Sequence, residues 1–130
     1  MPDSQNRELA KYRLAKSGEC TVAANSLLME GLYTHSVNRS YYAIFHAIRA
    51  VLALEGIDFK KHTGVISYFQ QHYIKTEIFE RKYSDYVKEA FTIRTDSDYE
   101  DFYDVSKNDA FEQLNHARQF IAAVEEYINK

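Results

Sequence analysis

Apolar side chains recur along this chain at intervals of three and four residues, the spacing that places them on one face of a helix. The first half of the chain predicts one long helix, or two abutting ones, over residues 7–30, with a kink at Ser17-Gly18. Gly31 is the expected stop, and the polar residues 34–36 are expected to link to a second helix and cap it. This second helix runs to about Leu54 and is apolar over most of its girth, which places it at the centre of a bundle.

The second half of the chain predicts further helices over residues 62–73 and 108–128, and residues 76–95 predict a helix or a turn followed by a helix. The inward stripe expected on the last of them consists of Ala110, Leu114, Ala117, Ile121, Val124 and Ile128. Residues 96–105 are acidic, aromatic and aperiodic, so they are expected to form a loop of about ten residues. Together these elements predict an all-α fold, an antiparallel up-and-down bundle of four to five helices.

Composition narrows this picture. The chain has 130 residues with only 4 Gly and 1 Pro, which fits a single domain, residues 1–130, built of long helices. A net charge of -3 argues against nucleic-acid binding through bulk electrostatics, although a local basic cleft stays open. The single cysteine, Cys20, excludes an intrachain disulfide and reads as a small core residue. A polar N-terminus without a signal peptide predicts a cytoplasmic protein. Because no apolar run is long enough to cross a membrane, no membrane partner is expected.

The central helix carries two polar residues within an otherwise apolar stretch, Arg39 and His46. They are seven residues apart, about two helical turns, so both side chains share a face with Tyr42. A histidine can move the proton of an RNA 2′-hydroxyl at neutral pH, and an arginine can hold the phosphate as negative charge builds. The pair therefore suits RNA cleavage without metal, with Asn38 and Tyr42 as candidate substrate contacts. One histidine covers one of two proton transfers, so the hypothesis requires a homodimer with a shared cleft.

Structural readings of these positions remain open. Arg39 could instead pair with an acid of the 96–105 stretch. Arg94 could contact substrate phosphate, or it could form a local salt bridge with Asp98 four residues later. The acidic stretch lacks the glycine and glutamate that an EF-hand calcium loop needs, and the remaining histidines show no metal-ligand spacing. We therefore expect no metal and no cofactor.

These motifs together resemble the HEPN (higher eukaryotes and prokaryotes nucleotide-binding) domain family. The residues that carry the resemblance are Gly31-x-Tyr33, the run Asn38-Arg39-Ser40-Tyr41-Tyr42-Ala43-Ile44-Phe45-His46-Ala47, Arg94-x-x-x-Asp98-Tyr99, and Ala117 and Phe120 in the final helix. The resemblance implies an all-helical bundle that is commonly dimeric. Many members are metal-independent endoribonucleases with an R-x(4–6)-H motif, which Arg39 and His46 match with six residues between them.

The resemblance also implies partners. Many small HEPN proteins are toxins whose antitoxin is a minimal nucleotidyltransferase, usually encoded next door. Some of these partners silence the toxin by adding AMP to a tyrosine near the motif, and Tyr41 and Tyr42 are the candidates here. In this chain Ser40 follows the motif arginine, where active members often carry Asn, Asp or His. The alternative is therefore a non-catalytic module that binds a nucleotidyltransferase or a nucleotide through the acidic, aromatic surface around Tyr99 and Phe102.

Overall fold

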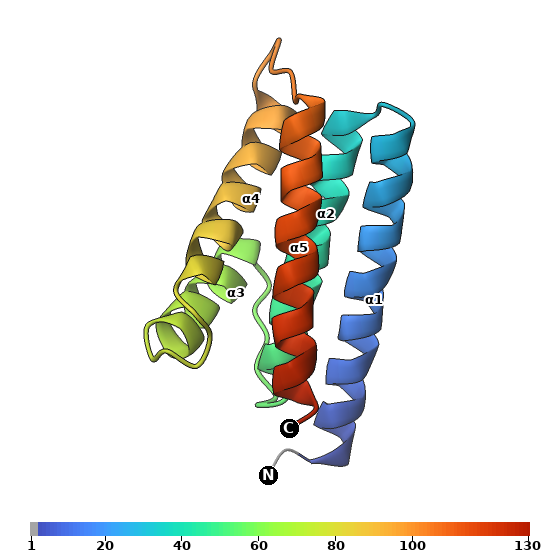
Figure 1. Ribbon diagram of the computed structural model, residues 1–130. Coiled ribbons are helices and arrows are strands. Elements are labelled where there is room, and N and C mark those ends of the chain that lie inside the picture. Colours follow the sequence, from blue (N-terminus) through green and yellow to red (C-terminus); the bar gives the residue numbers. More distant parts are fainter. Residues whose placement is uncertain (1–2) are drawn as a thin grey trace.

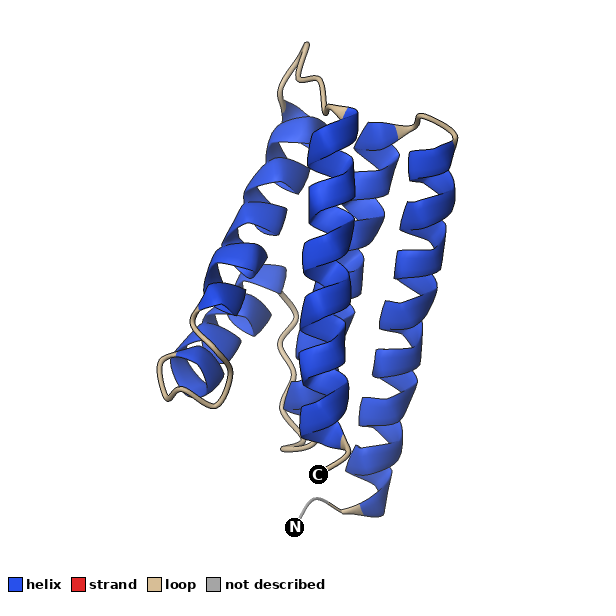
Figure 2. Cartoon of the chain, in the orientation of Figure 1, coloured by secondary structure: helices blue, strands red, loops and turns tan. Residues whose placement is uncertain are grey.

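The computed structural model describes residues 3–130, and every regular element in that range is helical (Figure 2). In chain order the elements are α1 (Ser4–Met29), α2 (Tyr33–Ala53), α3 (His62–Phe69), the π-helix η1 (Gln70–Ile74), α4 (Lys82–Tyr99) and α5 (Lys107–Ile128). Helices α1, α2, α4 and α5 run alternately up and down, with the short α3 beside the lower part of the bundle (Figure 1). The predicted all-α bundle is confirmed. Among residues 3–130, none of the helices combines the length and apolar character that a bilayer crossing needs.

Helix α2 is the centre of the bundle. Thirteen of its 21 residues are buried, and it packs against α1, α3, α4 and α5. The stripe expected to face the core is buried throughout: Tyr41, Phe45, Ile48 and Leu52 are each at most 5% exposed. Because the core surrounds so much of this helix, only a narrow part of its surface remains in contact with solvent.

Small residues hold α1 close to α2. Ala10, Ser17 and Ala24 follow one another at intervals of seven along α1, and all three are fully buried. Ser17 donates its hydroxyl hydrogen to the Ala43 carbonyl of α2 at 2.6 Å, and Ser36 of α2 donates to the Ala24 carbonyl at 2.8 Å. Two buried hydroxyls thus bond the backbone of the opposite helix in both directions, which fixes the register of the pair.

The connection between these two helices differs from the prediction. Gly31 adopts a positive φ of 79° and reverses the chain so quickly that α2 already begins at Tyr33. Residues 34–36, expected to form a link and a cap, lie within the first turn of α2, and the N-cap position, Leu32, makes no side-chain cap. The kink expected at Ser17-Gly18 is also wrong, because α1 is one continuous, straight helix (Figure 1).

The expected loop at 96–105 is shorter than predicted, because α4 continues to Tyr99. The additional turn is held by the ion pair between Arg94 Nε and Asp98 Oδ2 at 3.1 Å, a spacing of four residues. Ser97 also donates its hydroxyl hydrogen to the Arg94 carbonyl at 3.0 Å. The remaining connection to α5, residues 100–106, carries most of its side chains exposed to solvent.

An aromatic cluster joins α3, η1, α4 and α5. Phe120 of α5 is fully buried, and its ring lies 5.6 Å from that of Phe69, 6.1 Å from Phe79 and 5.5 Å from Tyr83. Edge-to-face and tilted pairs at these distances add to the burial of apolar area. Much of the heavy aromatic content is therefore used to attach α3 and the start of α4 to the main bundle.

Candidate functional site

From Arg39 to the end of α2, the positions that are not buried form one polar stripe of Arg39, Tyr42, His46 and Arg49. All four side chains are half-buried, at intervals of three, four and three residues, in a helix whose neighbouring positions are buried. The stripe opens between α1 on one side and α3 and α4 on the other, since it contacts residues of each. The predicted arrangement, a polar face opposite the apolar stripe, is therefore present.

Arg39 and His46 line the same open pocket of about 300 Å³ between α1 and α2. Its other walls come from α1: Lys16, Glu19, Cys20 and Ala23. Cys20 is buried as predicted, and burial raises the pKa of its thiol, so the thiol stays protonated at neutral pH. The two predicted catalytic side chains thus share one cavity that solvent can enter.

The guanidinium of Arg39 has no acidic partner. Its Nη2 donates to Asn38 Oδ1 at 3.3 Å, and its Cζ lies 4.8 Å from the centroid of the Tyr42 ring. Within residues 3–130 no carboxylate lies within ion-pair distance of it, so the acid partner considered from the sequence is not found. Its charge and the remaining donors of its fork are available to an anion such as a phosphate.

The surroundings of His46 keep it neutral at physiological pH. Burial lowers the pKa of the imidazole below 6.5, and the nearby cations of Arg49, Lys16, Arg39 and Arg13 lower it further. Its Nδ1 is buried and has no hydrogen-bond partner, and its ring lies 6.1 Å from that of Tyr42. A neutral imidazole can accept a proton, which is the state a general base needs.

Arg94 reaches the same stripe from α4. It forms the predicted salt bridge with Asp98, and its Nη2 also donates to the Tyr42 hydroxyl oxygen at 3.3 Å. Its Cζ lies 5.3 Å from the centroid of the Tyr41 ring and 5.7 Å from that of Tyr42. Arg39 and Arg94 therefore both lie close to the Tyr42 ring, and all three residues are sequence candidates for substrate contact.

The two tyrosines of the motif differ in access. Tyr42 is half-buried, whereas Tyr41 is only 1% exposed. Burial raises the pKa of Tyr41 to about 12, so its hydroxyl stays protonated. That hydroxyl lies 2.9 Å from His62 Nδ1. Burial also lowers the pKa of the His62 imidazole, and the tautomer of this ring sets which of the two groups donates.

Sequence reasoning missed His62 as a neighbour of the site. Its ring stacks on Phe45 at 3.9 Å and lies 5.8 Å from the Tyr42 ring. It is the first residue of α3, brought next to α2 by the fold, and the sequence gives no local signal of this proximity. Arg49 was also missed, although its spacing of three residues from His46 on the same face could have indicated it.

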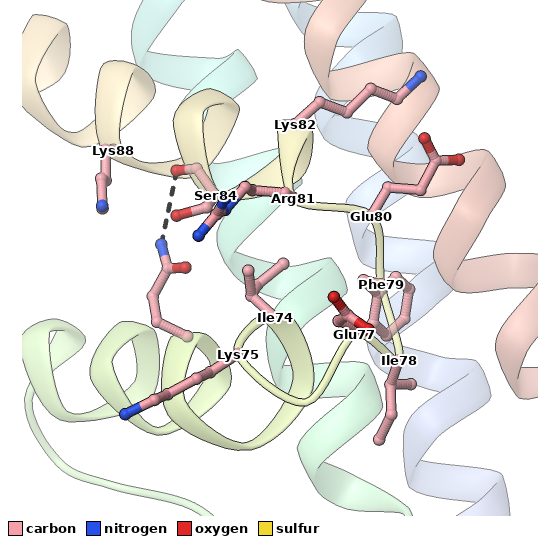
Figure 3. A pocket seen from close by; sticks show the side chains of 11 residues that line it. Ile74, Lys75, Glu77, Ile78, Phe79, Glu80, Arg81, Lys82, Ser84 and Lys88 are labelled. Carbon is pink, nitrogen blue, oxygen red and sulfur yellow. Dashed lines mark hydrogen bonds between the residues drawn. The ribbon is translucent and has the colours of Figure 1, made fainter.

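A larger cavity of about 930 Å³ lies away from this stripe, at the start of α4. Figure 3 shows Lys75, Arg81 and Lys88 on one side of it and Glu77, Ile78 and Phe79 on the other. Within the described range the three cations form no ion pair, so this cavity has a basic side open to anions. None of the candidate site residues predicted from the sequence lines it.

Comparison with known proteins places these features in a wider group. A family model described as the HEPN domain matches residues 10–127. The chain is 30% identical over 122 residues to a Methanocaldococcus jannaschii protein named "Putative toxin MJ0142", covering 94% of this chain and 82% of the relative. It is 26% identical over 125 residues to a "UPF0332 protein" of Thermotoga maritima, covering 96% and 95%. With "UPF0332 protein PH1297" of Pyrococcus horikoshii it shares 43% identity over 65 residues, half of this chain.

Proposed function

The chain belongs to the HEPN domain family, and on that premise we propose that it is a toxin that cleaves RNA without metal, through Arg39 and His46. The observation that carries the proposal is the pocket that both side chains line. Within residues 3–130 Arg39 forms no ion pair, although the Glu19 carboxylate lines the same pocket. Burial and the cations around His46 lower its pKa so that it is neutral. These are the states that phosphate binding and proton abstraction require.

In the proposed reaction His46 takes the proton of a ribose 2′-hydroxyl. The 2′-oxygen attacks the adjacent phosphorus, the bond to the 5′-oxygen breaks, and a 2′,3′-cyclic phosphate and a 5′-hydroxyl form. Arg39 stabilises the charge that develops on the phosphate oxygens, with Asn38, Tyr42 and Arg94 as further substrate contacts. The leaving 5′-oxygen takes its proton from the imidazolium form of a second His46, which a homodimer would bring to the shared cleft; the lowered pKa makes this the minor form at neutral pH.

The name of one relative supports the toxin assignment, since the Methanocaldococcus jannaschii protein is named "Putative toxin MJ0142". A toxin of this kind requires an antitoxin, and we propose a minimal nucleotidyltransferase as the partner. If it silences the toxin by adding AMP, Tyr42 is the favoured acceptor because Tyr41 is 1% exposed and bonded to His62. A phosphodiester on Tyr42 would lie between Arg39 and Arg94 and would occupy the proposed phosphate site.

The deciding experiment is cleavage of RNA by the purified protein in the presence of EDTA, with His46→Gln and Arg39→Ala as test variants. Sedimentation analysis of the same samples measures the dimer. Full activity in both variants would remove the proposed catalytic pair.

Removal of the Lys16 charge is expected to raise the pKa of His46 toward 6.5. Lys16 lines the pocket and is one of the cations that lower this pKa, so Lys16→Met removes a charge that disfavours the imidazolium. A pH titration of the His46 ring by NMR measures the shift directly, and the acid limb of the cleavage rate is expected to move to higher pH with it. Lys11→Met, an exposed position of the same helix, is the matched control and should leave the titration unchanged. A parent midpoint above 6.5 would contradict the prediction.

A second candidate function, a module that binds its partner without catalysis, is favoured by the exposed loop after α4. Phe102 is 100% exposed and adopts a φ of 62°, a left-handed conformation that costs a residue with a Cβ roughly 1–2 kcal/mol. Exposed acids surround it at Asp98, Glu100, Asp101 and Asp104. Strain without any packing gain indicates a role in binding, and the charge fits a basic-rimmed apolar pocket on the nucleotidyltransferase. The basic cavity at the start of α4 (Figure 3) suits the phosphates of a nucleotide.

Replacement of Phe102 by glycine is expected to separate partner binding from stability. Glycine adopts the positive φ without strain, so the free energy of unfolding should stay within about 1 kcal/mol of the parent. Loss of a buried aromatic contact in the complex should weaken binding of the neighbouring nucleotidyltransferase at least tenfold, because such contacts typically contribute about 2 kcal/mol or more. Calorimetric titration measures the affinity. Phe59→Ala, which changes an exposed aromatic residue in another loop, is the control. Binding by Phe102→Gly with the affinity of the parent protein would exclude this surface.

A further inference from the structure

A second group of polar side chains lies between α4 and α5, outside the pocket of Arg39 and His46. Glu89 of α4 and Glu112 and His116 of α5 each offer a ligand atom, and these atoms all lie within 4.8 Å of one another. Glu112 and His116 are four residues apart and therefore share one face of α5. In the part of the chain that the structure describes, this is the one such group of three.

The ring of His116 has a fixed orientation, but neither of its nitrogens has a hydrogen-bond partner. Its ring stacks on Tyr86 with the centroids 3.9 Å apart and the planes inclined by 4°, which fixes the ring orientation. Its Nε2 lies 3.8 Å from Glu112 Oε1, longer than a hydrogen bond, and its Nδ1 is buried without a partner. The imidazole therefore has unused ligand capacity beside two carboxylates.

A buried amide supplies a second, independent observation. Gln113 is 2% exposed, and its Nε2 donates to Glu89 Oε1 at 2.5 Å, so its amide end lies at this group. Its carbonyl oxygen, Oε1, is buried and accepts no hydrogen bond. The Gln113 amide therefore orients the Glu89 carboxylate, the role that hydrogen-bonding partners of metal ligands have.

We propose that Glu89, Glu112 and His116 form a binding site for a divalent transition-metal ion of the Zn²⁺ type, with the Gln113 amide holding Glu89 in place. Carboxylates alone would favour Mg²⁺ or Ca²⁺, whereas an imidazole nitrogen favours zinc, copper or nickel. One nitrogen and two carboxylate oxygens supply three of the four ligands that Zn²⁺ prefers, and water completes the shell. An ion bound there would link α4 to α5, the two helices that the 100–106 loop connects. The site is independent of the proposed RNA cleavage.

The test is calorimetric titration of tag-free protein with ZnCl₂, combined with thermal unfolding with and without the ion. We expect one ion per chain and a higher unfolding temperature with zinc, because a ligand that binds only the folded state stabilises it. His116→Phe keeps the aromatic stack on Tyr86 and removes the nitrogen ligand. It should weaken zinc binding by more than about tenfold, since even outer-shell partners of metal ligands contribute 10- to 100-fold. MgCl₂ in place of ZnCl₂ should give no comparable binding.

Two variants control for other ligands on the surface. His35→Phe and Glu126→Gln change exposed residues outside the group and should keep the parent affinity for zinc. No zinc binding by the parent, or parent affinity in His116→Phe, would overturn the proposal. If circular dichroism shows that His116→Phe does not fold, the exposed variants Glu89→Gln and Glu112→Gln decide, and parent affinity in both would overturn it equally.

Discussion

Replacement of His46 by glutamine is expected to slow RNA cleavage by about 10²- to 10⁴-fold, the usual contribution of a positioned acid or base. Glutamine keeps a polar side chain in the half-buried position on α2 but cannot exchange a proton at neutral pH. Arg39→Ala should cost about 10²- to 10³-fold through loss of phosphate stabilisation. Arg39→Lys should recover only part of the rate, because an ammonium cannot form the paired hydrogen bonds of a guanidinium.

The measurement is single-turnover cleavage of a defined RNA in EDTA, with folding checked by circular dichroism. Lys11→Gln, an exposed change on α1 outside the pocket, is the control for loss of surface charge and should cleave at the parent rate. Parent rates for both His46→Gln and Arg39→Ala would rule out the catalytic pair and leave the partner-binding module as the better account.

Phe120→Ala is expected to destabilise the fold by about 3–5 kcal/mol, the range found when a buried phenylalanine is truncated. Phe120 is fully buried, and the rings of Phe69, Phe79 and Tyr83 lie around it. The truncation therefore leaves a cavity that these three segments could fill only by moving toward α5. This is a large share of the roughly 5–15 kcal/mol by which such domains are stable. Urea unfolding followed by circular dichroism at fixed protein concentration measures the loss.

Phe111→Ala is the matched control on the same helix. Its side chain is 53% exposed, so the free energy of unfolding should fall by less than about 1 kcal/mol. Similar losses at both positions would mean that the aromatic cluster does not hold α3 and α4 to α5 as described.

The sequence predicted the helices well because their apolar spacing is regular and breakers are few. The polar stripe of α2 could also be predicted from the sequence, since Arg39 and His46 interrupt an otherwise apolar helix at a spacing of two turns. Gly31 and Gly56, which follow the ends of α1 and α2, both adopt positive φ, as expected of helix-terminating glycines. Local pattern is sufficient for such features because neighbouring residues alone produce them.

Features that depend on contacts between distant segments were missed. Ser36 or Thr34 was expected to cap α2, but both lie within the helix and the Ser36 hydroxyl bonds the Ala24 carbonyl across the helix pair. The final helix was expected to bury Ile121, which is half-buried, while Phe120 beside it is fully buried because the rings of α3 and α4 enclose it. His62 reaches the site only through the packing of α3 on α2. No spacing within one helix encodes these proximities.

The width of the pocket between α1 and α2 depends on three small residues of α1, Ala10, Ser17 and Ala24. The distance between two packed helices follows the size of the side chains at their contact. The pocket of Arg39 and His46 lies in the same α1–α2 seam. A bulkier residue at position 17 would therefore push α1 and α2 apart and widen the mouth of the pocket, although Ser17 itself does not line it. The width of this pocket is therefore set by residues of the α1–α2 contact that do not line it, and it can change while Arg39 and His46 stay the same.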